Sequence, residues 1–289
     1  MLFRSGDYFY ARTETGEVTD VNALTREDVA AWWATFARPD MAVMIFAGDI
    51  TPDRAEQLAA STLGAWKAEG EKPKTTLPEI PAPADTKIIL VDRPGSVQSE
   101  IRVGRVGFTR HDPRYATSRV ASGYFGGAFN SRMNETIRVK KGLTYGARGG
   151  FSSSRFAGEF SASTFTKTPS TAETVQTIYD ELERLKYEPP SDKELNDTKS
   201  YILGSFVGAR ETPQAVAGDV WLMESMGLSR DYFKGMMSEV SATTAEQCTG
   251  LAQEMIDPSK LVVVVAGDAA QIKESLEKIA PVEVVKPNE

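Results

Sequence analysis

The fold is decided by residues 129–146, which read FNSRMNETIRVKKGLTYG. Apolar side chains recur every four positions at Phe129, Met133 and Ile137, and this spacing predicts a helix with one apolar face. Gly142 follows two lysines and is typical of the residue just after a helix C-terminus. We expect the helix to end there and a strand to begin at once, from Leu143 to Phe151.

Two polar side chains stand on either side of this predicted turn. Arg138 lies near the end of the helix and Tyr145 seven residues later, so both can face one space. A guanidinium group positions a carbonyl or carboxylate, and a phenol can donate a hydrogen bond to a developing oxyanion. Neither group is a nucleophile or a metal ligand. The alternative is that Arg138 is an exposed helix residue and Tyr145 a half-buried strand residue.

A repeat at an offset of 219 residues defines the domain organisation, with Thr25 aligning with Thr244. The same offset aligns Pro39 with Pro258, and the run Ala47-Gly48-Asp49 with Ala266-Gly267-Asp268. Each copy predicts a helix, a buried apolar strand and a second helix. The first copy has its strand at Met41–Phe46. A repeat this long indicates duplicated domains.

The start of the second copy has no counterpart in the first, so we expect a truncated first domain and a complete second one. The predicted boundaries are 1–66 for the end of the first domain, 67–85 for a proline-rich linker and 86–289 for the second domain. Blocks of alternating strands and amphipathic helices indicate an α+β fold, with helices packed on a largely antiparallel sheet.

Composition excludes several classes of function. The net charge is −7, and no basic face stands out, which disfavours nucleic acid and anionic membranes as partners. The single cysteine, Cys248, fits a helix as a small core residue, and the single histidine, His111, reads as a loop residue. No run of 18 apolar residues occurs, and the N-terminus lacks the apolar core of a signal peptide.

Two further stretches have more than one interpretation. The glycines of 123–129 resemble a phosphate-binding loop, but the lysine of a P-loop is missing, and a glycine break between packed helices fits better. The strand expected at 158–165 could pair its edge with an extended peptide, although an interior strand is the simpler interpretation.

The stretch 123–146 resembles the second-domain motif of the M16 metallopeptidase family, which includes pitrilysin, insulinase and the mitochondrial processing peptidase. The matching residues are Gly126, Gly127, Phe129, Ser131, Arg132, Arg138, Gly142, Leu143 and Tyr145. The resemblance implies duplicated M16-type domains that close like a clamshell around a peptide. It also implies that Arg138 and Tyr145 contact that peptide opposite a zinc ion.

The family's zinc motif, His-x-x-Glu-His, is absent from this sequence. The resemblance therefore implies a non-catalytic, substrate-binding C-terminal half of an M16-like peptidase, inactive alone and with no metal or cofactor of its own. Zinc would come from a complementary M16 half, upstream in the same chain or in a separate subunit. The alternative is a non-proteolytic scaffold subunit. The family resemblance suggests a soluble protein of the bacterial cytoplasm or periplasm, and the sequence does not decide between them.

Overall fold

The structure is a computed structural model that describes residues 15–74 and 85–287. These residues divide into two compact units. The first unit contains residues 85–205 and 230–287, and the second contains residues 15–74 and 206–229. Residues 206–229, which lie inside the predicted second domain, thus group with the N-terminal segment.

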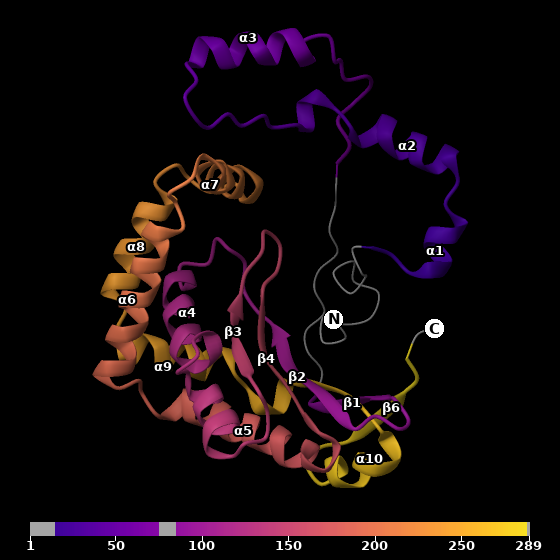
Figure 1. Cartoon of the computed structure of the whole chain (residues 1–289), viewed down its shortest axis with the longest axis vertical. Helices are drawn as coiled ribbons and strands as arrows, with labels where there is room; N and C mark the ends of the chain where they lie inside the picture. The colour runs from indigo at the N-terminus through magenta and orange to yellow at the C-terminus, as the bar shows by residue number, and fades with distance from the viewer. Residues whose placement is uncertain (1–14, 75–84, 288–289) are drawn as a thin grey trace. The chain divides into compact units, whose positions relative to one another are not determined.

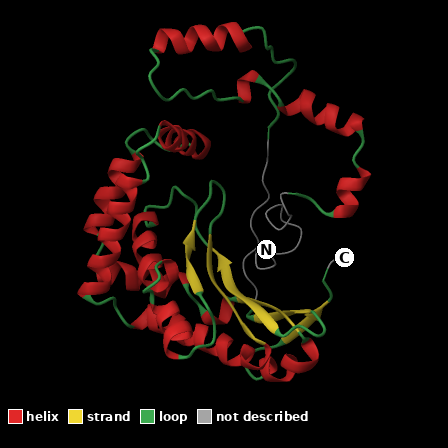
Figure 2. Ribbon diagram, in the orientation of Figure 1, coloured by secondary structure: helices red, strands yellow, loops and turns green. Residues whose placement is uncertain are grey.

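The first unit is built on a six-stranded mixed sheet in the order β3-β4-β2-β5-β1-β6 (Figures 1 and 2). β1 runs parallel to both β5 and β6, whereas β2 is antiparallel to β4 and β5, and β3 to β4. The prediction of a largely antiparallel sheet is confirmed. The strands are β1 (Lys87–Asp92), β2 (Gln98–Val106), β3 (Ala147–Ser152), β4 (Glu159–Lys167), β5 (Val262–Gly267) and β6 (Val282–Val285).

Helices pack on one face of this sheet and bury the core. Along β2 the buried side chains of Ile101 and Val103 alternate with exposed Glu100 and Arg102, as a strand covered on one side requires. The opposite face, which carries the exposed β2 side chains, is the open face of the sheet among the described residues of this unit. The helices of this unit are α4 (Tyr115–Ser122), α5 (Thr171–Tyr187), α6 (Asp192–Gly208), α8 (Tyr232–Ala242), α9 (Ala245–Met255) and α10 (Ala269–Glu277).

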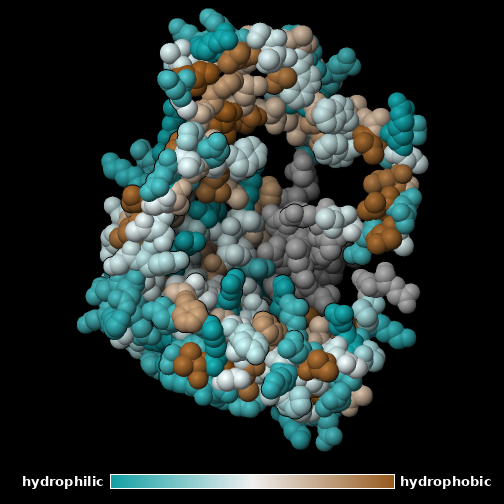
Figure 3. All heavy atoms as spheres, in the orientation of Figure 1, coloured by the Kyte–Doolittle hydropathy of each residue, from teal (hydrophilic) through white to brown (hydrophobic). Residues whose placement is uncertain are grey.

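The second unit has almost no interior. Its helices are α1 (Val18–Ala23), α2 (Arg26–Phe36), α3 (Pro52–Leu63) and α7 (Pro213–Met226). Among its described residues only Arg38 is buried. Trp32 is 59% exposed and Trp33 66% exposed, and Figure 3 shows apolar residues at the surface of the 15–74 segment. Burial of apolar area drives folding, and exposed apolar surface of this kind is typical of sites where another protein surface packs.

The helices of the repeat match at the predicted offset. α2 begins with a capping box between Thr25 and Asp28, and α9 begins with one between Thr244 and Gln247. Both helices contain 11 residues. A short 3-10 helix follows each of them, at Pro39–Met41 and Pro258–Lys260.

The strand predicted at Met41–Phe46 is wrong. Its counterpart in the second copy is β5, which pairs with β1 and β2 at the centre of the sheet. Residues 42–47 instead form no strand, and Met44 and Val43 are exposed. A strand needs hydrogen bonds from a neighbour, and the described part of the second unit contains no other strand to provide them.

Candidate functional site

The helix predicted from residue 129 starts later than expected, and its turns contain more residues than those of an α-helix. Phe129 lies outside it and is 72% exposed, while Met133 and Ile137 are fully buried. Residues Asn134–Lys140 form a π-helix, η5, and Gly142 follows with a φ of 64°. A glycine tolerates this left-handed backbone, so the predicted stop is confirmed. The next strand, β3, begins at Ala147, leaving Tyr145 in the connecting bend.

Arg138 and Tyr145 line the same depression, which has a volume of about 640 Å³. The Arg138 guanidinium lies over the ring of Phe129, 4.7 Å from its centroid. The Tyr145 side chain is 82% exposed. Neither side chain packs in the hydrophobic core. The expectation that both face one space agrees with this geometry.

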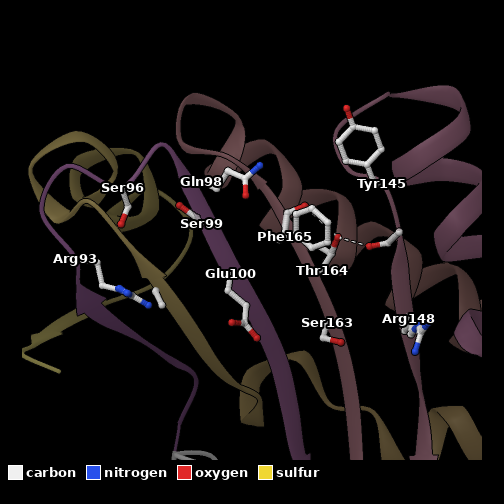
Figure 4. Close-up of a pocket in the computed structure, with 12 residues that line it drawn as sticks. Arg93, Ser96, Gln98, Ser99, Glu100, Tyr145, Arg148, Ser163, Thr164 and Phe165 are labelled. Atoms are coloured by element: carbon white, nitrogen blue, oxygen red, sulfur yellow. Dashed lines mark hydrogen bonds between the residues drawn. The ribbon is translucent and has the colours of Figure 1, made fainter. Parts of the chain in front are cut away.

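Side-chain hydrogen bonds fix the backbone around Tyr145. The Thr164 hydroxyl donates to the Gly146 carbonyl at 2.9 Å (Figure 4), and the Thr144 hydroxyl accepts from the Gly146 N–H at 3.2 Å. Asn134 joins η5 to β3 by accepting from the Ala147 N–H at 3.3 Å and donating to the Phe129 carbonyl at 2.6 Å. The phenol of Tyr145 is thus held on an anchored backbone while its ring remains accessible.

Arg132 has a structural role, unlike Arg138. Its side chain is 4% exposed and bonds to both oxygens of Glu194, at 2.7 and 3.1 Å. It also donates to the carbonyls of Glu188 and Pro189. Burial raises the pKa of Glu194, but hydrogen bonds from Arg132 and Ser191 outweigh it and lower the pKa to about 2. The sequence motif alone does not distinguish these two arginines.

The outer edge of β3 is closed to another strand. The Phe151 N–H donates to the Ser122 hydroxyl at 2.8 Å, and the Ala147 N–H is bound by Asn134. Between them, a Cβ on Gly126 would lie 2.2 Å from the Gly149 nitrogen, so the two backbones are in close contact. β4 is an interior strand, as the simpler interpretation predicted.

The open face carries a second depression of about 620 Å³ that shares Tyr145 and Arg148 with the first (Figure 4). The register places Arg148 beside Ser163, and Ser163 beside Arg102. Arg102 is bound to Glu100 at 2.8 Å. The small side chains of Ser161 and Ser163 thus form the floor of the two depressions. The longer charged side chains of Arg148, Arg102 and Glu100 surround this floor.

Residues 15–74 and 85–287 contain no group of three or more His, Cys, Asp or Glu side chains that could hold a metal ion. His111 lies in an exposed turn. Cys248 is fully buried, as predicted, and desolvation raises the pKa of its thiol to about 12. A thiol must ionise to bind zinc, so these residues do not fit that metal.

No helix within the described ranges combines the length and apolar character needed to cross a bilayer.

Comparisons with known proteins agree with this fold. The sequence model of one family, described as the peptidase M16 inactive domain, matches residues 23–202. The chain therefore belongs to the M16 peptidase family and contains its inactive domain. It is 22% identical over 255 residues to an uncharacterized zinc protease of Streptomyces coelicolor, covering 87% of this chain and 55% of that protein. An uncharacterized zinc protease of Bacillus subtilis is 23% identical, with 75% and 52% covered.

The chain thus spans about half the length of the curated relatives it matches. Among solved structures, a peptidase M16 inactive domain from Pseudomonas fluorescens has a TM-score of 0.77 and 24% identity, over 97% of this chain and 64% of that one. A protease from Helicobacter pylori has a TM-score of 0.80 and 17% identity, with 87% and 61% covered. A chain of complex III2 from Candida albicans has a TM-score of 0.77 and 14% identity, with 94% and 66% covered.

Proposed function

We propose that this chain is the non-catalytic, substrate-binding half of an M16-like zinc metallopeptidase that degrades or processes peptides. One observation carries the proposal: Arg138 and Tyr145 line one accessible depression, and the core uses neither side chain. A polar pair that contributes little to stability is expected where a ligand binds. The relatives named as zinc proteases support the same reading.

Exposed features of the second unit favour a complementary partner. An apolar surface of the partner would cover the exposed tryptophans, and a strand of the partner would pair with the 42–47 segment. We propose that residues 1–66 belong to a first M16-like domain, that 67–85 link it to the second domain at 86–289, and that a complementary M16 half supplies zinc. The partner half lies upstream in the same polypeptide or in a separate subunit. The protein would act as a soluble enzyme of the bacterial cytoplasm or periplasm.

The test is peptide cleavage by the chain joined to a zinc-bearing M16 half. Tyr145→Phe removes only the phenol oxygen, and loss of one preorganised donor at a developing oxyanion costs about 3 kcal/mol, or roughly a hundredfold in kcat. The ring is exposed, so the melting temperature should not change. Arg138→Ala should raise KM more than it lowers kcat, because a positioning guanidinium stabilises ground and transition states alike.

Tyr187→Phe is the matched control, because Tyr187 is also exposed but lies at the end of α5. It should leave both kcat and KM unchanged.

The alternative function is a scaffold subunit, which the similarity to a chain of complex III2 favours. Normal cleavage by both Tyr145→Phe and Arg138→Ala would reject the proposed peptidase roles of the pair, and no cleavage by the parent assembly would favour the scaffold.

A further inference from the structure

Charge is distributed unevenly around the two joined depressions. The charged residues that line them are Arg93, Glu100, Arg138 and Arg148. Only one of the four is acidic, although the whole chain has a net charge of −7. Glu100 is already bound by Arg102 at 2.8 and 2.9 Å. The open face is therefore locally cationic on an acidic protein.

Three guanidinium groups remain available at this surface. In the part of the chain that the structure describes, Arg93, Arg138 and Arg148 make no salt bridge. Asp92 lies next to Arg93 in sequence, but its carboxylate accepts the Ala269 N–H at 3.0 Å. An arginine without a carboxylate partner presents a planar set of donors that matches a carboxylate or phosphate.

The shape of the surface selects the form of the ligand. Ser161 and Ser163 line the floor between β2 and β3 and leave room for a chain lying across the strands. Phe165 follows Ser163 by two residues on β4, so it lies on the same face of the sheet, where it is exposed and offers an apolar contact for the stem of a side chain. Figure 4 shows Arg93 and Arg148 on opposite sides of this floor, with Ser163 and Glu100 between them.

We propose that Arg93 and Arg148 make this site selective for peptides that carry carboxylate groups. This inference rests on the proposed function and adds its substrate class. The anion is either an acidic side chain or the C-terminal carboxylate, since both present the same two oxygens. Complementary charge discriminates between ligands by attracting one sign and repelling the other.

The test is a binding titration at low ionic strength, in which the full chain is added to a peptide labelled with a neutral dye. Fluorescence anisotropy of the dye measures binding. The peptides are a twelve-residue chain with several Glu residues, its Gln isostere, and the C-terminal amide of each. The Glu peptide should bind more tightly than the Gln peptide. Equal binding of acid and amide assigns the anion to side chains, and loss on amidation assigns it to the C-terminal carboxylate.

Arg93→Gln and Arg148→Gln should each weaken binding of the anionic peptide about two- to fivefold, as expected for an exposed ion pair, and added salt should remove the difference. Arg119→Gln is the matched control, because Arg119 is also exposed but belongs to α4 in the helical layer. Circular dichroism checks that each variant folds.

Equal affinity for all four peptides, no binding of any, or equal weakening by Arg119→Gln would overturn the proposal. Cleavage of neutral peptides by the assembled enzyme would then leave the proposed function standing. Conversely, anionic selectivity with no cleavage by the assembly would reject the peptidase role alone.

Discussion

At the scale of single residues, the arginines of the motif stretch have separate tasks. Arg132 is buried and bonds to Glu194 and two carbonyls, whereas Arg138 lies over an exposed ring and faces the depression. Arg132→Met should lower the free energy of unfolding by about 3 kcal/mol, because the buried carbonyls and Glu194 lose their donor. Arg138→Met should change it by less than about 0.5 kcal/mol. Urea denaturation measures both, and equal effects would contradict the division of roles.

The lowered pKa of Glu194 predicts that the free energy of unfolding depends on pH. Its folded pKa of about 2 lies below the ordinary value of 4.5, so its contribution to stability is present above pH 4.5 and is lost as the pH falls toward 2. Because the side chain is 33% exposed, solvent screening limits that contribution to about 2 kcal/mol. Glu194→Gln should be less stable than the parent at pH 6 and approach it near pH 2. A constant difference between the two across this range would contradict the pKa assignment.

At the scale of elements, a close backbone contact holds the site together. The π-helix η4 (Gly123–Gly127) meets β3 where Gly126 faces Gly149. A Cβ at position 126 would lie 2.2 Å from the Gly149 nitrogen and 2.7 Å from its oxygen, and backbone atoms cannot move aside easily. Gly126→Ala should therefore destabilise the first unit by about 2 to 3 kcal/mol. It should also speed hydrogen exchange at the Phe151 N–H.

Gly235→Ala provides the control for that substitution. Gly235 lies within α8, and a Cβ there meets no atom within 4 Å. Alanine should stabilise a helix interior by about 0.5 to 1 kcal/mol. If both alanine variants shift the melting temperature in the same direction, the contact between η4 and β3 is not what makes Gly126 necessary.

Local patterns in the sequence predicted the helices well and the strands less well. The capping boxes of α2 and α9 depend on residues three positions apart, which the sequence displays directly. A strand depends on hydrogen bonds to distant residues, so the apolar run at Met41–Phe46 could not reveal that its partners are missing from the described unit. A π-helix widens each turn by about one residue, and the four-residue spacing at 129–137 gave no sign of it.

The candidate site was predictable in part for the same reason. Arg138 and Tyr145 flank one turn, so their proximity follows from sequence alone. Arg93 follows β1 and Arg148 lies on β3, and they reach the same depression only because the sheet order places β5, β2 and β4 between those two strands. Their opposite positions across the floor require knowledge of strand pairing, which no local motif provides.

At the scale of the whole molecule, the two units differ in what stabilises them. The first has a continuous buried core that includes Phe125, Phe160 and Leu182. The described part of the second has one buried residue, and that residue is the arginine Arg38. A folded domain gains most of its stability from buried apolar area, so the second unit should depend on a binding partner.

The tryptophans provide a direct test of that dependence. All four, Trp32, Trp33, Trp66 and Trp221, belong to the second unit, so indole fluorescence reports on it alone. In the isolated chain, acrylamide should quench this fluorescence strongly, because three of the indoles are more than half exposed. Adding the zinc-bearing half should lower the quenching constant and shift the emission to shorter wavelength, since apolar contacts remove water from the rings. Tyr145→Phe should give the same protection, because Tyr145 belongs to the first unit, and full quenching at saturating partner would show that the exposed apolar surface is not where the halves meet.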